Sequence, residues 1–389
     1  MKWHSIRTKV LAALLACLLL GVGGILALMH YSCERNSRIM ANESVSGAEK
    51  LFGILEAREI SKMKAVSEVL LADPEVRDAF VAKDRTRLNG LAAALYPELK
   101  KEGITNWMFH TPEPNMAVFL RVHNPGKFDD HLNRYIDAEV ARTHGIVTGN
   151  ELAKAGFAAR VIRPFHDSKG GVTGYVEFGE ELGQFMHAMK KRTGDDYALL
   201  LSKQFVDRQF WADSSAVWKR RDNWNDHAGF VVADKTTDSE RIIQFDGELT
   251  SVPEDGKVLE RYRSGNAVFV RGIFPIHDAA GKAVGAMFVV RDISSFYLAM
   301  KRTERTLILV TVAALAIGIA VVLTLLTSLI FRRLDHIIGV ATRVVGGDYE
   351  SEIQVSSDDE VGQFERLFEQ FRRVFLDVLT HVPELQERR

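Results

Sequence analysis

Cysteine is almost absent from this chain of 389 residues, and neither sign of charge is in excess. Only Cys17 and Cys33 are present, within and just after one apolar segment, so no disulfide framework is possible. The formal net charge of −1 provides no broad positive field for nucleic acid. The sequence also lacks a glycine-rich phosphate loop, a Ser–His–Asp arrangement and a metal-binding motif, so it indicates no catalytic activity, cofactor or metal.

Long uncharged runs are present instead, one near each end of the chain. Val10–Met29 is a run of 20 residues without a charge, and Thr306–Phe331 is a run of 26. Each is long enough to cross a hydrocarbon core of about 30 Å, where only helices satisfy the backbone of such a segment. We therefore expect transmembrane helices at residues 10–31 and 306–331. A cleaved signal peptide, or a lipoprotein signal ending at Cys17, would be too short for the first run, which favours an uncleaved anchor.

Basic residues flank the two runs and predict the orientation of the chain. The residues that precede the first run or follow the second are Lys2, Arg7, Lys9, Arg332, Arg333 and Arg343. Cytoplasmic flanks of membrane helices are enriched in such residues, whereas long translocated regions largely escape this bias. The basic residues at 301, 302 and 305 count against this orientation but adjoin the long region. We expect an integral protein of the bacterial cytoplasmic (inner) membrane, with residues 1–9 and the tail 381–389 in the cytoplasm and residues 30–305 outside, in the periplasm or extracellular space.

The outer region begins with a helical pattern and continues with strand patterns. Apolar residues recur at helical spacing after the first run, and Asp73-Pro74 ends this pattern, so a long helix is expected within residues 32–82. Beyond it, alternating segments predict hairpins at 106–122, 157–178 and 268–290, and a strand that begins near Tyr197. The fold class expected for the chain is α+β.

Two of the hairpins carry the same motif. Arg160-x-x-x-Pro-x-His-Asp-x-x-Gly-x-x-x-Gly174 recurs as Arg271-x-x-x-Pro-x-His-Asp-x-x-Gly-x-x-x-Gly285, with every matched position offset by 111 residues. Proline ends a strand ladder, aspartate starts a turn and glycine supplies positive φ. We expect tandem α/β lobes at residues 83–190 and 191–300. The repetition favours a turn over a metal site for each His-Asp pair.

Polar and aromatic residues in the first lobe are candidates for binding a ligand. The set is Trp107, Phe109, Phe119, Arg121, His123, Glu151, Phe157, Arg160, Tyr175 and Glu177. Strand parity places Tyr175 and Glu177 on one face, and Glu151 is expected in a loop. Arginine among aromatic side chains suits a small organic acid or an amino-acid-like anion. The alternative is that Arg121 forms a structural ion pair with Glu151 or Glu177. In the second lobe, Trp211, Trp218, Trp224 and residues 260–263 suggest loop and edge positions with a structural or weaker binding role.

After the second membrane segment, two short amphipathic patterns are separated by a connector. Gly346-Gly347-Asp348 ends the first, and Asp358-Asp359-Glu360 opens the second. Their apolar seams repeat as in coiled coils, at Leu334, Ile337, Ile338, Ala341, Val344 and Val345 and then at Val361, Phe364, Leu367, Phe368, Phe371, Val374, Phe375 and Val378. Neither helix can bury its seam alone, so a homodimeric four-helix bundle is expected.

This segment, residues 332–380, resembles the HAMP module of bacterial receptors. The resemblance rests on Gly347, Asp348, Asp359, Glu360, Gly362, Phe368 and Phe371. It departs from the usual pattern at Leu334-Asp335, where a proline is missing, and at Glu369, where asparagine is common. The resemblance implies a module that relays a signal from the membrane helix to an output domain.

The outer region resembles the double-Cache sensor regions of chemoreceptors and sensor histidine kinases. The matching residues are Phe119-Leu120-Arg121-x-His123-x-Pro125-x-x-Phe128-x-Asp130, Gly149-x-Glu151, Gly156-Phe157-x-x-Arg160 and Val176-Glu177-Phe178-Gly179. The resemblance implies two PAS-like lobes on a long helix, with a small-molecule ligand in the membrane-distal lobe.

Together these features predict a receptor subunit for signal transduction. No kinase segment, cyclase domain or methylated hairpin follows residue 380, so a kinase, cyclase or chemoreceptor signalling domain is expected on a separate protein. Three alternatives stay open: a truncated or degenerate receptor, a membrane-anchored solute-binding protein without signalling, and an extracytoplasmic enzyme.

Overall fold

A computed structural model describes residues 6–153, 156–167, 169–217, 220–237, 239 and 242–386. The chain divides into two compact units, one of which is Glu34–Leu298 and the other Met1–Cys33 with Ala299–Arg389. Trp218, one of the tryptophans considered in the second lobe, lies outside the described residues.

Among the described residues, two helices are long and apolar enough to cross a membrane. They are α1 (Ile6–Ala72), which contains the first uncharged run, and α7 (Ser294–Leu326), which contains most of the second. A short π-helical turn, Thr327–Phe331, leads from α7 into α8 (Arg332–Val345), and α9 (Glu360–Gln386) follows after a connector. The helix ends agree with the sequence, because α8 stops at Gly346 and α9 starts after Asp359.

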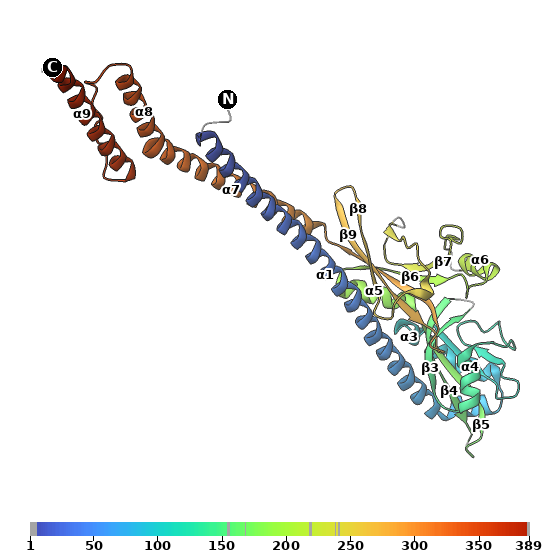
Figure 1. Cartoon of the computed structure of the whole chain (residues 1–389). Helices are drawn as coiled ribbons and strands as arrows, with labels where there is room; N and C mark the ends of the chain where they lie inside the picture. Colours follow the sequence, from blue (N-terminus) through green and yellow to red (C-terminus); the bar gives the residue numbers. More distant parts are fainter. Residues whose placement is uncertain are drawn as a thin grey trace. The chain divides into compact units, whose positions relative to one another are not determined.

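The first lobe is a five-stranded antiparallel sheet with helices on both faces (Figure 1). Helices α2 (Pro74–Val81) and α3 (Arg85–Lys101) precede β1 (Asn106–His110) and β2 (Val118–Arg121). Helix α4 (Tyr135–Thr143) then leads to β3 (Val147–Ala153), β4 (Gly156–His166) and β5 (Val172–Glu181). The strand order is β2-β1-β5-β4-β3. Glu151 lies on β3, so its expected position in a loop was wrong.

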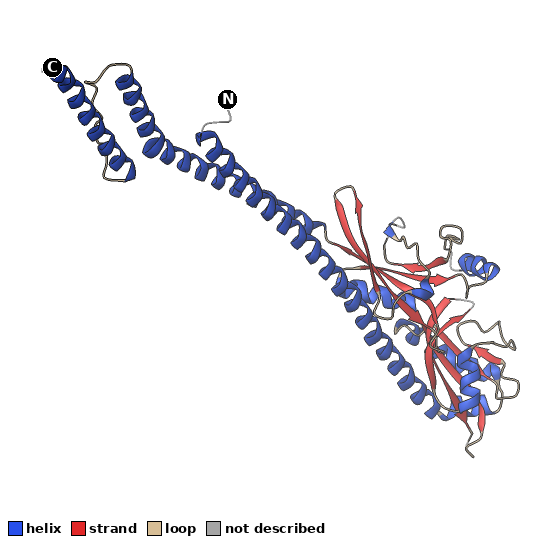
Figure 2. Ribbon diagram, viewed as in Figure 1, coloured by secondary structure: helices blue, strands red, loops and turns tan. Residues whose placement is uncertain are grey.

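The second lobe repeats this topology. It contains α5 (Leu182–Thr193), β6 (Asp196–Ser202), α6 (Arg208–Val217), β7 (Phe230–Lys235), a 3-10 turn at Leu249–Ser251, β8 (Lys257–Ser264), β9 (Ala267–His277) and β10 (Ala283–Asp292). Its strand order, β7-β6-β10-β9-β8, is the order of the first sheet with each strand replaced by its counterpart. The strands of both sheets are drawn in red in Figure 2. Residues 260–263 lie on the edge strand β8, as expected, but Trp211 lies on α6 and is buried.

The repeated turns also have the same geometry. Asp167 Oδ1 accepts hydrogen bonds from the backbone N–H groups of residues 169 and 171, and Asp278 Oδ1 accepts them from residues 280 and 282. Gly170 and Gly281 adopt φ of +84° and +76°, a region that favours glycine. The tandem repeat predicted from the motif is therefore confirmed, and the two aspartates act as turn residues.

One continuous apolar core joins the outer part of α1 to both lobes. Phe52 of α1 packs against Phe185 of α5 and Phe274 of β9, with ring centroids 5.9 and 6.0 Å apart. Farther along, Met63 is fully buried in the same cluster, which also contains Trp107 of the first sheet. A movement of either lobe against this helix would have to repack shared side chains.

Strand register sorts the first sheet into an apolar face and a polar face. Residues directly opposite one another on neighbouring strands point to the same side. Glu177 lies opposite Met108 and Ile162, Arg160 lies opposite Gly149, and Glu151 lies opposite Ala158. Arg160, Glu177 and Glu151 therefore share one face, which α4 covers. The other face carries Trp107, Phe109, Val161 and Phe178 toward the helices of the core.

Candidate ligand-binding site

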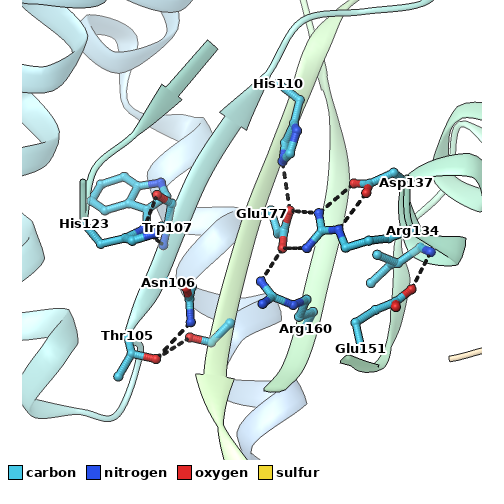
Figure 3. Close-up of polar contacts among 12 residues, drawn as sticks. Thr105, Asn106, Trp107, His110, His123, Arg134, Asp137, Glu151, Arg160 and Glu177 are labelled. Carbon is cyan, nitrogen blue, oxygen red and sulfur yellow. Dashed lines mark hydrogen bonds and ion pairs between the residues drawn. The ribbon is translucent and has the colours of Figure 1, made fainter. Parts of the chain in front are cut away.

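Glu177 is the centre of a buried ionic cluster on the polar face (Figure 3). Its side chain is 0% exposed and lies in the middle strand, β5. Arg134 donates to both carboxylate oxygens, at 2.9 and 2.7 Å, and Arg160 Nη1 donates at 2.7 Å. His110 Nε2 lies 2.8 Å from the same carboxylate. Three side chains from β1, β4 and the start of α4 thus converge on one carboxylate.

Arg134 connects this cluster to α4. It occupies the position before the helix and also bonds Asp137 in the first turn, at 2.7 and 2.8 Å, so its guanidinium lies between two carboxylates (Figure 3). Glu151 Oε1 accepts a hydrogen bond from the backbone N–H of Ile136 at 2.8 Å. A carboxylate is favourable beside the positive end of a helix. The position of α4 therefore depends on charged groups of β3 and β5.

Burial and the neighbouring arginines determine the charge states of Glu177 and Glu151. Burial opposes the charged form of Glu177, but attraction to Arg134 and Arg160 outweighs it and holds the pKa of this carboxyl well below its ordinary value. Burial raises the pKa of Glu151, although the N–H of Ile136 and the charge of Arg134 act in the opposite direction. Glu177 is thus held ionised, whereas Glu151 is the acidic group that a further positive charge would stabilise.

One donor in the cluster has no acceptor. Arg160 is 3% exposed, and its Nε atom is buried without a hydrogen-bond partner among the described residues. A buried N–H left unpaired costs free energy, more so on a charged group. This N–H is therefore available to an oxygen atom of a bound molecule.

Arg121 shares the face of Glu177 by register, since it lies opposite Met108, but it binds elsewhere. Its guanidinium donates to Asp130 Oδ2 at 2.9 Å and to the carbonyl oxygen of Lys127 at 3.0 Å. The expected structural ion pair does exist, but its assignment to Glu151 or Glu177 was wrong. Asp130 lies only nine residues away on the loop that returns past β2, so the short connection favours that partner.

His123 lies just beyond β2 and does not join the cluster. Its Nδ1 atom is 3.3 Å from both the N and O atoms of Trp107. Burial lowers the pKa of His123 to about 4, and the positive charges of Arg121 and Arg160 act in the same direction. The imidazole is therefore neutral at physiological pH and fastens the chain after β2 to β1.

The aromatic candidates lie in different surroundings from the charged ones. Trp107 stacks on Phe178 at a centroid distance of 5.4 Å, and Phe109 and Phe119 pack against Phe80 of α2 at 5.1 and 5.7 Å. Phe157 is a core residue near the second lobe. These four rings pack in the core and do not wall the Glu177 cluster.

Tyr175 does lie on the polar face, where it packs with Ile136, Val140 and Ile162 beneath α4. Its hydroxyl group bonds Glu113. Of the ten candidates, the structure therefore brings Arg160, Tyr175 and Glu177 together under α4, with Glu151 at its edge.

Sequence reasoning missed His110, Arg134 and Asp137. The i, i+3 spacing of Arg134 and Asp137 is a signal of a local ion pair, but their link to Glu177 spans 43 positions and has no local signature. The oxygen and nitrogen atoms of His110, Asp137 and Glu177 lie within 4.8 Å of one another, a spacing that a metal ion would accept. Here, however, Arg134 bridges both carboxylates and supplies the positive charge, so we assign these residues to an ionic cluster.

The equivalent face of the second lobe is apolar. The offset of 111 residues relates Glu177 to Phe288, which is fully buried among Ile243, Leu249 and Leu200. Arg271, the counterpart of Arg160, donates instead to the carbonyl oxygens of Glu260 and Ile242. An ionic cluster of the kind found in the first lobe is therefore not formed there by the described residues.

The helix pair α8 and α9 is held by the residues that identified it in the sequence. Asp359 Oδ1 accepts from the N–H of Gly362 at 2.8 Å, and Arg333 donates to Asp359 at 2.8 Å. Gly347 adopts φ of +96° just after α8, and Asp348 accepts from the N–H of Ser351. Phe368 packs on the small core of Ile337, Val340 and Ile353. Other seam residues of α9 are more exposed. Val361, which follows Glu360, is partly exposed, and Phe364, Leu367, Phe371 and Val374 are strongly exposed.

Comparison with known proteins places the outer region in a family. The family model of the double sensory domain of two-component sensor kinases, a double-Cache domain, matches residues 53–247. The chain belongs to this family, which confirms the resemblance of its outer region and defines it as the sensory region of a receptor. A comparison with curated proteins found no match.

Solved structures of sensor domains also resemble the chain. The periplasmic domain of Vibrio cholerae LuxQ is 10% identical, with a TM-score of 0.39, and the alignment covers 65% of this chain and 99% of that one. The ligand-binding domain of the Campylobacter jejuni chemoreceptor Tlp3, in complex with 4-methylisoleucine, is 9% identical, with a TM-score of 0.39 and coverages of 66% and 91%. The sensor domain of the V. cholerae histidine kinase DctB is 8% identical, with a TM-score of 0.39 and coverages of 66% and 98%.

Proposed function

We propose that this protein is a receptor of the bacterial inner membrane that detects a small amino-acid-like acid with its first lobe. In this proposal α1 and α7 cross the membrane, both termini are cytoplasmic, and Glu34–Leu298 lies outside. The basic residues next to the two uncharged runs support this orientation. The family of double sensory domains supports the sensory role.

The unpartnered Nε–H of Arg160 is the observation that carries the choice of ligand. It points to an acceptor that the protein does not supply, and a carboxylate is the strongest acceptor for a guanidinium group. Glu151, whose pKa burial raises, lies on the same face and would be stabilised by the ammonium group of an amino acid. A ligand that carries both a carboxylate and an ammonium group would therefore pair with both Arg160 and Glu151.

Binding would move α4 through competition for arginine. A ligand carboxylate beside Arg160 attracts the same guanidinium groups that now bind Glu177. One of them belongs to Arg134, the residue that directly precedes α4, so its movement would displace the helix. The ligand shifts the receptor only if it binds the displaced arrangement more tightly than the present one. Side chains of β3 and α1 pack in the apolar core that the two lobes share. The shift of α4 is therefore transmitted to α1 and to the second lobe.

Isothermal titration of the full chain in lipid nanodiscs tests the ligand class. We expect binding of at least one compound in a panel of L-amino acids and small carboxylates, and a loss of roughly tenfold or more in affinity for Arg160→Met. Arg163→Met is the matched control, because Arg163 is on the same strand but faces Glu68 of α1. Binding of only neutral or cationic compounds, or unchanged affinity in Arg160→Met, would contradict the proposal.

We further propose that the helix pair 332–380 works as a HAMP module in a homodimer. In one chain the side chains of Phe364, Phe371 and Val374 are 50%, 64% and 64% exposed, and a second copy would bury them in a four-helix bundle. The output protein in this proposal is a separate cytoplasmic chain that responds to the packing of α9.

Disulfide crosslinking of single cysteines placed from Ala341 to Val345 tests the relay in nanodiscs. We expect the pattern to change when the ligand is added, because the bundle changes its packing. An identical pattern would contradict the relay. Phe364→Ser should abolish signalling but keep ligand binding, whereas a tethered solute-binding protein would retain its full function after that change.

A further inference from the structure

A partly open cavity lies at the junction of the two lobes. Its volume is about 50 Å³, and residues of β3, β4, β5, α5, β6, α6 and β7 line it. Phe157, Phe210 and Trp211 form its aromatic walls. The cavity lies on the side of the second sheet that carries Leu199 and Leu201, apart from the apolar face around Phe288. One of its lining residues, Glu181, lies opposite Ala158 and so shares the polar face of the first sheet with Arg160.

An unpaired donor lines this cavity. Trp211 is 8% exposed, and its Nε1 atom is buried without a hydrogen-bond partner among the described residues. Buried indole N–H groups usually have an acceptor. The donor therefore indicates an oxygen atom of an occupant.

Two carboxylates also line the cavity. Glu181 ends β5, and Asp234 lies on β7 against the first turn of α5, where a Cβ atom at Gly183 would come within 2.0 Å of Asp234 Oδ2. Arg220 also lines the cavity. Two carboxylates and one guanidinium leave one negative charge to be compensated. Burial, and to a smaller degree the charge of Asp234, raise the pKa of Glu181, whereas Arg160, a hydrogen bond from Asn106 and Arg220 act in the opposite direction.

We propose that this cavity binds a small molecule that carries an ammonium group and an oxygen acceptor. The ammonium group lies beside Glu181 and Asp234 and against the aromatic walls, and the oxygen accepts from Trp211 Nε1. One water molecule needs about 10–15 Å³ of such volume, so the cavity holds roughly three to five non-hydrogen atoms. A simple amino alcohol meets these limits.

An occupant would connect the two lobes. Phe157 and Glu181 belong to the first sheet, whereas Trp211 and Asp234 belong to the second lobe. A molecule that contacts all four favours the arrangement in which the lobes are close. The site is therefore a second input that acts on the relay without occupying the first lobe's cluster.

Ethanolamine is the probe, with ethylamine and ethanol as analogues that each lack one group. Titration of the full chain in nanodiscs should show binding of ethanolamine, no tighter than tens of micromolar for so small a molecule. Each analogue should bind at least tenfold more weakly. Amide hydrogen exchange should show protection of α6 and β7 by ethanolamine. This series needs no altered protein.

Substitutions then locate the contacts. Asp234→Asn should weaken ethanolamine binding at least tenfold, whereas Asp222→Asn, whose carboxylate pairs with Arg208, should not. Trp211→Phe should remove the preference for ethanolamine over ethylamine, and Trp224→Phe should keep it. No binding of the probe, equal binding of the analogues, or protection confined to the first lobe would each overturn the proposal.

Discussion

Replacing Glu177 by glutamine removes the charge on which the first lobe's polar face depends. Glutamine keeps the size of the side chain and one carbonyl acceptor, so the change isolates the charge. Arg134 retains Asp137 as a partner, but Arg160, which is 3% exposed, loses its only carboxylate partner among the described contacts. The substitution therefore leaves one buried guanidinium group without a hydrogen-bonded carboxylate among the described contacts.

Removing one partner of a buried ion pair costs about 3–5 kcal/mol. For a unit of this size, each kcal/mol lowers the melting temperature by roughly 2–4 °C, so Glu177→Gln should melt roughly 10 °C below the native protein. A second variant, Glu177→Leu with Arg160→Met, removes the charge on both sides. It should recover much of the loss, since apolar pairs often replace buried ion pairs at little cost.

Near-ultraviolet circular dichroism of the full chain in nanodiscs measures the melting temperature of the packed lobes. The control is Glu254→Gln, because Glu254 is 82% exposed and its pairing with His277 contributes at most about 1 kcal/mol. If Glu177→Gln melts as the control does, or if the double variant is no more stable than Glu177→Gln, the cluster is not a dry ionic network and the reasoning fails.

Two further changes test other parts of the chain. Burial, only partly opposed by Lys62, raises the pKa of Glu180 to about 7 from an ordinary value of 4.5, so its contribution to stability is complete below 4.5 and is lost as the pH rises to about 7. Urea unfolding should thus show Glu180→Gln losing less stability than the native protein between about pH 5 and about pH 8, and parallel curves would contradict this. A Cβ atom at Gly362 would lie 1.8 Å from the carbonyl oxygen of Ser357, so Gly362→Ala should disrupt the start of α9. A Cβ atom at Gly339 of α8 would meet only Arg343 Nη1, at an ordinary contact distance of 3.8 Å, so Gly339→Ala should stabilise its helix by up to about 1 kcal/mol. Equal effects of the two substitutions on helicity and melting would refute the assignment.

Local patterns predicted the elements that have strong periodicity or turn chemistry. The uncharged runs, the hairpins around Asp167 and Asp278, and the helix stop at Gly346 were all found from the sequence. Strand β3 was missed because Gly149 and Asn150 are poor strand formers whose conformation is fixed by pairing with β4. Its assignment required a partner strand that local sequence does not reveal.

Strand parity predicted which candidate residues share a face of the sheet but not which of them pair. Tyr175 and Glu177 were correctly placed on one face, because side chains alternate along a strand. The partner of each arginine was not predictable, because several carboxylates could pair with it and the fold decides which of them comes close. Arg121 binds its close neighbour Asp130, and Arg134, absent from the candidates, takes the place at Glu177.

A final prediction follows from the contrast between the two lobes. Phe288→Glu would place a carboxylate at the second-lobe position equivalent to Glu177, but Leu200 stands where the first lobe has His110, and Arg271 donates to backbone carbonyl groups. The new carboxylate would be desolvated without ion-pair partners, so its pKa would rise and its charged form would destabilise the fold. We expect Phe288→Glu to melt well below Phe288→Leu, and the difference to be larger at about pH 8 than at about pH 5, where the carboxyl group is protonated. A difference independent of pH would mean that the second lobe can accommodate the charge, and the restriction of the ionic cluster to the first lobe would then not follow from its side chains.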